Sequence, residues 1–88
     1  MPWRRRADTL FRRAPDGVLV ISLGGGDPIW LSAPGDAIWA LLDAPLAIDE
    51  LVERLADQFG AAVDTVRTDC LATLNELEAR GLVESVVS

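Results

Sequence analysis

The side chains that most often carry catalysis or bind metals are scarce in this sequence. Its 88 residues include no histidine, tyrosine or lysine, and Cys70 is the only cysteine. The usual zinc ligands, the Ser–His and Cys–His pairs and Schiff-base chemistry are therefore missing. Carboxylates are plentiful, but their spacing places them on the outer faces of expected helices, with no sign of a desolvated pair. We expect no catalysis by the isolated chain, no cofactor and no metal.

Two features could still bind a ligand or react, and both have a simpler interpretation. Gly24-Gly25-Gly26 suggests a phosphate-binding loop, but such loops precede a helix and usually offer a lysine. Here the glycines lead into Asp27, Pro28 and an expected strand, so we interpret them as a turn. Cys70 lies in an apolar helical stripe beside Asp69, whereas a reactive thiol needs an electropositive setting. We therefore expect Cys70 to be a core residue.

Charge is distributed unevenly along the chain. Residues 1–13 contain five arginines and one aspartate, whereas residues 14–88 contain three arginines and 13 carboxylates. An acidic body is a poor partner for nucleic acid, because phosphate neutralisation supplies most of that affinity. The longest unbroken apolar run, over residues 37–42, is far shorter than the roughly 20 residues that a membrane span needs. We expect neither nucleic acid nor a membrane as a partner.

Length and cysteine usage predict one cytoplasmic domain. A single cysteine cannot form an internal disulfide, and a reducing compartment fits that best. The short basic segment over residues 1–8 has no apolar stretch after it and is expected to be a flexible arm. The folded domain is therefore predicted over residues 9–88.

Alternating apolar residues and turn residues predict three strands, over 9–13, 18–23 and 28–32. Ala14-Pro15-Asp16-Gly17 is a typical turn between the first two. Pro28 lacks an N–H group, which is tolerated at the first position of a strand or on an edge. The third strand, Pro28–Ser32, is therefore predicted to lie at the edge of the sheet.

Beyond Ser32 the apolar spacing becomes helical. A first helix is expected from an N-cap at Ser32 to Leu42, a second over Ile48–Phe59, and a third from an N-cap at Asp64 to about Arg80. Leu82-Val83 and Val86-Val87 could add a short last strand. This order predicts a winged-helix-like α+β fold, with a three-stranded antiparallel sheet followed by three helices.

The three tryptophans differ in their expected surroundings. Trp3 lies in the arm and is expected to be exposed, whereas Trp39 flanks the apolar stripe of the first helix and is expected in the core. If Ile29 and Leu31 face inward, Trp30 faces outward or under a neighbouring helix. A packing role and a ligand contact for Trp30 are both left open.

Several stretches resemble, in their order and spacing, the PqqD family of recognition elements for the leaders of ribosomally made, modified peptides. They are Val18–Leu23, Ile29–Ser32 with Gly35–Asp43, Ile48–Leu55, and Asp69–Leu77 leading into Arg80–Val83. The chain departs from the family pattern in having Ser32 after the third strand and Ala47 before the second helix. Ser32 keeps the capping chemistry, while Ala47 loses a side-chain acceptor.

The resemblance implies a leader-binding chaperone that adds the leader as a strand beside the third strand, in a groove shared with the third helix. The leader-binding residues that it implies are Ile29, Trp30, Leu31, Ser32, Val66, Arg67, Cys70, Leu71 and Leu74. Arg67 is the basic group expected to meet a leader carboxylate. The implied partners are the precursor peptide and a modifying enzyme, such as a radical SAM protein or a leader peptidase. A homodimer through strand pairing is a further option.

A winged-helix layout also allows a transcription-associated protein that binds DNA or another protein. The expected third helix carries two more acidic than basic residues, whereas a helix that enters the major groove should be basic. A domain separated from a larger maturation enzyme is a third option. The charge therefore favours peptide binding over DNA binding.

Overall fold

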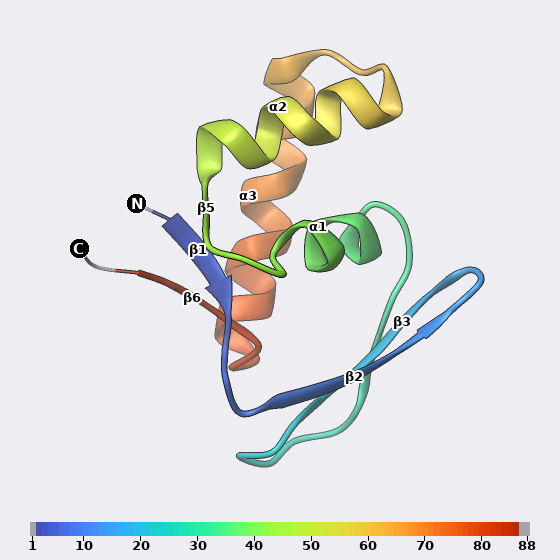
Figure 1. Cartoon of the computed structure of the whole chain (residues 1–88), viewed down its shortest axis with the longest axis vertical. Coiled ribbons are helices and arrows are strands. Elements are labelled where there is room, and N and C mark those ends of the chain that lie inside the picture. The colour runs from blue at the N-terminus through green and yellow to red at the C-terminus, as the bar shows by residue number, and fades with distance from the viewer. Residues whose placement is uncertain (1, 87–88) are drawn as a thin grey trace.

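Two three-stranded antiparallel sheets and three helices make up the fold over residues 2–86, which the computed structural model describes (Figure 1). The first sheet has the order β2-β3-β4, with β2 at Thr9–Ala14, β3 at Gly17–Ser22 and β4 at Ile29–Leu31. The second has the order β5-β1-β6, with β1 at Pro2–Arg5, β5 at Leu46–Ala47 and β6 at Val83–Ser85. The helices are α1 at Gly35–Leu41, α2 at Ile48–Phe59 and α3 at Val63–Ala79.

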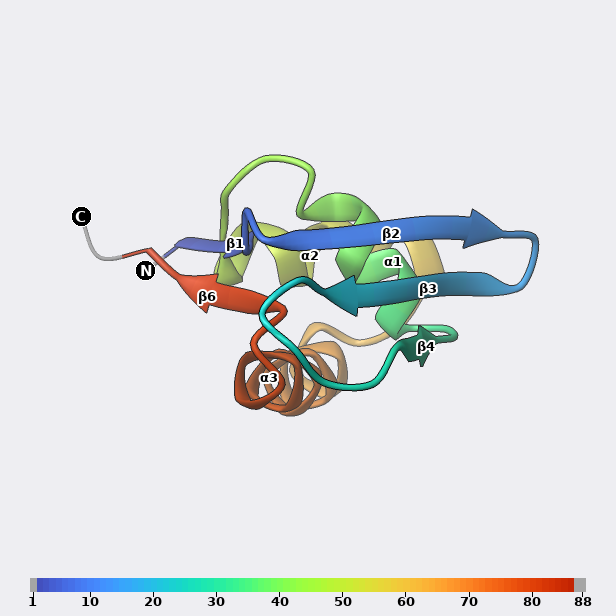
Figure 2. The same ribbon diagram turned by 90° about the horizontal axis from the view of Figure 1, so that it is seen from below.

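The first sheet confirms the predicted meander and leaves β4 at an edge. In its register Leu10 faces Ile21, and Leu19 faces both Arg12 and Trp30. Because side chains alternate between the faces of a sheet, these residues share the outer face. Val18 and Val20 lie on the inner face and are buried against the helices. Figure 2 shows β2, β3 and β4 side by side in this order, with β4 and α3 both below β3 in the view.

The second sheet corrects the prediction of a flexible arm over residues 1–8. Pro2–Arg5 form β1, which pairs with β6 at the other end of the chain and with β5. Trp3, expected to be exposed, is partly buried against the hydrophobic core. The segment is ordered because it pairs with Val83–Ser85. The prediction missed this pairing because the two strands are about 80 positions apart, and no local sequence pattern reports so distant a partner. Val87, part of the expected last strand, lies outside the described residues.

The helices agree with the prediction in extent but begin differently. The second helix runs over Ile48–Phe59 as expected, and Gly60 ends it in the left-handed conformation with φ of 62°. The predicted caps are wrong: Ser32 precedes α1 without a side-chain cap, and Asp64 is already inside α3, which begins after Ala62. Ser32 instead accepts the N–H groups of Gly35 and Asp36 at its backbone carbonyl, at 2.8 and 3.3 Å.

The core lies where α1 packs between the sheets and the other two helices. Trp39 is 1% exposed, as expected for a core residue, and Cys70 is equally buried. The largest fully buried side chains come from every layer: Trp39, Ile38, Leu42, Leu51, Leu55, Leu74, Leu82, Val20, Val52 and Val83. Over the described residues, no helix is both long and apolar enough to cross a membrane.

Candidate functional site

A groove of about 430 Å³ lies between β4 and the C-terminal half of α3. One wall is the segment 28–32, which contains β4, and the other is a stripe of α3. The stripe consists of Thr73, Glu76, Leu77 and Arg80, which recur at helical spacing and so share one side of the helix. The groove therefore joins an open strand edge to a helix face.

The backbone of β4 is open toward this groove at Trp30. The Leu23 N–H donates to the Asp8 carbonyl at 2.7 Å, which makes that pair a hydrogen-bonded one. Hydrogen-bonded and non-bonded pairs alternate along antiparallel strands, so Leu19 of β3 is bonded to β2. Its opposite partner, Trp30, then has its N–H and C=O pointing away from β3. An extended peptide beside β4 would pair with these two groups.

The side chain of Trp30 lies on the outer face of the sheet and is 48% exposed. It packs across Gly17, where an added Cβ would lie only 2.5 Å from the indole Cζ2 and 2.5 Å from the Leu31 carbonyl oxygen. The φ of Gly17 is not positive, so its backbone conformation does not require glycine. Glycine is needed here because only a residue without a Cβ allows β4 to approach β3 so closely. Of the two orientations left open for Trp30, outward or under a neighbouring helix, the structure has the outward one.

Two opposite charges border the groove on α3. The Arg80 Nη2 lies 3.4 Å from the Glu76 Oε1, one helical turn away. Both side chains are at least half exposed, so this pair contributes little to stability. Either charge is free to meet an oppositely charged group of a bound peptide.

The structure brings together only part of the predicted site. Ile29, Trp30, Leu31 and Ser32 all line the groove, as expected. The predicted α3 residues do not, because the half of α3 that lies beside β4 is the C-terminal one. Leu74 is fully buried in the core, and Leu71 is exposed outside the groove.

The remaining α3 residues of the prediction serve other contacts. Arg67, expected to meet a leader carboxylate, makes an ion pair with Asp49 of α2 at 2.8 Å. Val66 and Cys70 line a separate, largely apolar hollow of about 130 Å³ between α1, α3 and the end of α2. Pro34 borders both this hollow and the groove, so the two are neighbours along α3. Contact of Arg67, Val66 and Cys70 with a bound peptide stays a prediction.

Thr73, Glu76, Leu77 and Arg80 are the groove residues of α3 that sequence reasoning missed. They lie beside the buried stripe of Cys70 and Leu74, and the buried Leu77 borders both stripes. The missing information was the crossing of α3 over the sheet, which depends on tertiary packing. A polar stripe beside an apolar one was the available signal.

Burial raises the pKa of the Cys70 thiol to about 11, and the nearby Arg67 opposes that rise. Cys70 should therefore react with a disulfide reagent at pH 8 about 100-fold more slowly in the folded protein than in urea, because an unperturbed thiol has a pKa of about 8.5. The folded state holds this proton to higher pH than the unfolded state does. The free energy of unfolding should consequently fall as the pH rises above about 8.5.

Stopped-flow absorbance of the released thiolate measures the reaction rate with and without urea. Equal rates in the two states would show that Cys70 is accessible and ionised, against the burial described here. Denaturant titrations at pH 7 and above pH 9 provide the stability comparison.

The arrangement of three helices, a meander sheet and a groove at the sheet edge defines a small α+β domain built around an open strand edge. The model of the family described as "Coenzyme PQQ synthesis protein D (PqqD)" matches residues 17–83. The chain belongs to the PqqD family. Among curated proteins, none matches the sequence.

Solved structures share this fold over nearly the whole chain. TbiB1 in complex with the TbiA(beta) leader peptide is 24% identical, with a TM-score of 0.86 over 97% of this chain and 99% of that one. The PqqD truncation of Methylobacterium extorquens PqqCD is 15% identical, with a TM-score of 0.78 over 96% and 89%. Lasso peptide synthetase B1 complexed with the leader peptide is 17% identical, with a TM-score of 0.78 over 94% and 98%. The expected α+β fold is thereby confirmed.

Proposed function

We propose that this protein binds the leader segment of a ribosomally synthesised precursor peptide as an added strand beside β4. The observation that carries the proposal is the free edge of β4 facing a groove of about 430 Å³ on α3. Backbone hydrogen bonds to the edge provide affinity in this mode, and side-chain pockets provide specificity. The protein acts by holding the peptide, without catalysing a reaction itself.

Membership of the PqqD family supports this proposal. Two proteins of the same fold are described as complexes with leader peptides, and the PqqD truncation is described as a stand-alone recognition element of ribosomally synthesised and modified peptides. The modifying enzyme that receives the precursor is a radical SAM protein or a leader peptidase in this proposal. The complex forms in the cytoplasm, where the precursor is translated and the thiol of Cys70 stays reduced.

The groove fits a peptide in which apolar residues alternate with others. Every second side chain of an added strand points to the same side, so one set enters the groove toward Leu77. The groove also offers one carboxylate, Glu76, and one guanidinium, Arg80. A leader residue of either charge can therefore be matched, and Arg80 replaces Arg67 as the expected partner of a leader carboxylate.

The test is a titration of the labelled protein with the N-terminal segment of the precursor encoded beside its gene. We expect amide shifts over residues 28–32 and 73–80 in heteronuclear spectra. Thr73→Trp fills the groove and should raise the Kd by about 30-fold, or roughly 2 kcal/mol. Thr68→Trp, on an exposed face of the same helix, is the matched control and should leave the Kd unchanged.

Three outcomes would refute the proposal. The first is no binding at about 100 μM peptide, a limit that corresponds to roughly 5.5 kcal/mol of binding free energy. The second is amide shifts confined to other surfaces, and the third is an equal change of Kd in the two tryptophan variants. Circular dichroism melts of both variants separate loss of binding from loss of folding.

A further inference from the structure

The first sheet has a second open edge, on β2. This strand spans Thr9–Ala14 and is twice as long as the three residues of β4. Over residues 2–86 it pairs only with β3, and five of its six residues are exposed. By the alternation set by the Asp8–Leu23 pair, Thr9, Phe11 and Arg13 point their backbone N–H and C=O groups away from β3. An edge of this kind is a template for a further strand.

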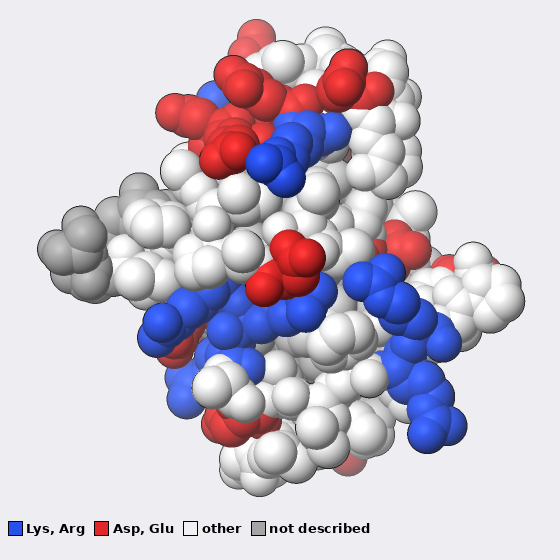
Figure 3. Space-filling model, viewed as in Figure 1, with Lys and Arg blue, Asp and Glu red and all other residues white. Residues whose placement is uncertain are grey.

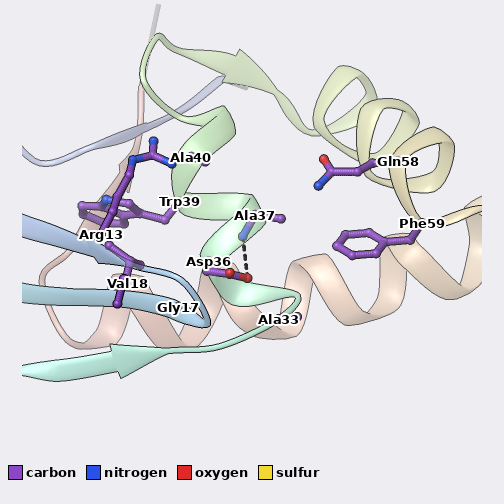
Figure 4. A pocket seen from close by; sticks show the side chains of 11 residues that line it. Arg13, Gly17, Val18, Ala33, Asp36, Ala37, Trp39, Ala40, Gln58 and Phe59 are labelled. Atoms are coloured by element: carbon purple, nitrogen blue, oxygen red, sulfur yellow. Dashed lines mark hydrogen bonds between the residues drawn. The ribbon is translucent and has the colours of Figure 1, made fainter.

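Two hollows border the inner face of β2, the face that is turned toward α1. The first, of about 310 Å³, lies between Phe11 and the loop after α1, which includes Asp43. The second, of about 300 Å³, lies under the end of the β2–β3 hairpin, between Arg13, Val18 and α1, and the end of α2 borders it. In Figure 4 Arg13, Trp39 and Ala40 lie at one end of this second hollow, with Gln58 and Phe59 of α2 at the other. The two hollows thus lie next to the inward-facing residues of β2, Thr9 and Phe11 at one end and Arg13 at the other.

The charge along β2 is positive and largely uncompensated. Among residues 2–86, no carboxylate forms an ion pair with Arg12 or Arg13, whereas Arg4 and Arg6 are paired with Glu84 and Asp8. Figure 3 shows basic residues gathered over β1 and β2 and acidic residues gathered over α2. Such a surface attracts an acidic ligand and repels a basic one.

Carboxylates on the opposite wall of these hollows reduce this positive charge without cancelling it. Asp36 borders the hollow next to Arg13, but its Oδ1 accepts the N–H of Ala37 at 2.9 Å. Asp43 borders the other hollow together with Arg5; burial lowers the pKa of that guanidinium, Asp43 opposes this shift, and Arg13 adds to it. Arg12, on the outer face beside Leu19, faces neither carboxylate across these hollows.

We propose that the β2 edge binds an acidic, extended segment of a partner protein by strand addition. A second copy of this chain is a poorer occupant, because antiparallel pairing of two β2 strands sets the arginines of one copy near those of the other, and like charges across strands are destabilising. The proposal does not depend on what β4 binds. If β4 holds a leader, one sheet carries the peptide on one edge and the partner protein on the other.

The probe is a capped peptide of about eight residues in which Val and Glu alternate, since a strand of this length spans β2. Titrated into labelled protein, it should shift the amides of Thr9, Phe11 and Arg13 more than those of Leu10 and Arg12. The same peptide with Lys in place of Glu should produce no shift on β2. Binding should weaken at least tenfold when salt rises from about 0.05 to 0.5 M.

Charge-reversal variants identify the residues responsible. Arg12→Glu should weaken binding of the Val–Glu peptide at least tenfold, and Arg13→Glu should do the same. Arg54→Glu changes the net charge equally but lies on α2, where Arg54 pairs with Glu50 at 2.8 Å, and it should leave the affinity unchanged. Equal weakening by all three variants would mean that overall charge, and not the β2 edge, attracts the peptide, and would overturn the proposal.

Backbone pairing is tested separately from charge. Arg13→Pro removes an outward N–H, which an edge strand tolerates, and Arg13→Ala removes the charge alone. The proline variant should bind at least threefold more weakly than the alanine variant, with both melting cooperatively. Equal peptide affinities of the two variants would contradict strand addition, and so would amide shifts confined to β4. A protein that is already a dimer through β2 at about 100 μM, by sedimentation equilibrium and amide shifts, would contradict an acidic partner as the occupant.

Discussion

Arg5→Ala should lower the free energy of unfolding by about 2 kcal/mol and Tm by roughly 10 °C. The Arg5 side chain leaves β1 and reaches the end of α1, where its Nε and Nη2 donate to the Trp39 carbonyl at 2.9 and 2.6 Å. The last carbonyls of a helix have no partners within the helix and carry the negative end of its dipole. Removing Arg5 leaves this partly buried carbonyl with only the Leu42 N–H, at 3.2 Å, as a donor.

Arg5 also joins layers that the chain connects only through long segments. Its guanidinium carbon lies 4.6 Å from the ring centre of Phe11 on β2 and 5.0 Å from that of Trp39 on α1. Burial lowers the pKa of Arg5, but the guanidinium stays protonated at neutral pH because its ordinary pKa lies far above neutrality. One charged side chain thus connects β1, β2 and α1.

Arg4→Ala is the matched control, on the same strand and with the same atoms removed. Arg4 pairs with Glu84 at the surface, and exposed ion pairs of this kind contribute about 0.5 kcal/mol or less. Thermal melts and urea titrations of the two variants provide the comparison. Equal losses of stability would show that the contacts of Arg5 with α1 contribute nothing special. Arg5→Lys should fall between the two, because an ammonium cannot reproduce the planar donor geometry.

Local sequence patterns predicted the helices and strands that short stretches of neighbouring residues determine. The spacing of Leu51, Val52 and Leu55 describes one buried stripe, and Gly60 marks the end of α2 without reference to the rest of the chain. The first sheet is likewise local, because short turns connect its strands and Pro28 reports the edge position of the third.

Long-range pairing explains what the sequence did not predict. Trp3 pairs with Ser85, and nothing in residues 1–8 alone distinguishes a strand from a frayed arm. The same limit applies to the candidate site. On the strand side of the groove, the lining residues include the predicted Ile29–Ser32, since these belong to one local edge. The helix side was displaced toward Val66, because the part of a 17-residue helix that meets a strand depends on the crossing of the two elements.

Gly17→Ala should weaken leader binding at least tenfold and cost about 2 kcal/mol of stability. An added Cβ would lie 2.5 Å from the Leu31 carbonyl oxygen, and backbone at that distance must move. The movement separates β4 from β3 at the end of the hairpin and pushes the Trp30 indole outward. Because β4 provides one wall of the groove, a change in the turn should reach the proposed peptide site.

Gly24→Ala is the control for the general effect of replacing glycine. A Cβ at Gly24 would lie 3.5 Å from the nearest atom, an ordinary contact, and its φ is not positive. Both substitutions reduce the entropy of the unfolded chain equally, so their difference reports the clash at β4. Peptide titrations and urea unfolding of the two variants measure it. Unchanged peptide affinity in Gly17→Ala, with the loss of stability present, would mean that the leader does not pair with β4, because no strand could add to a displaced edge without a cost.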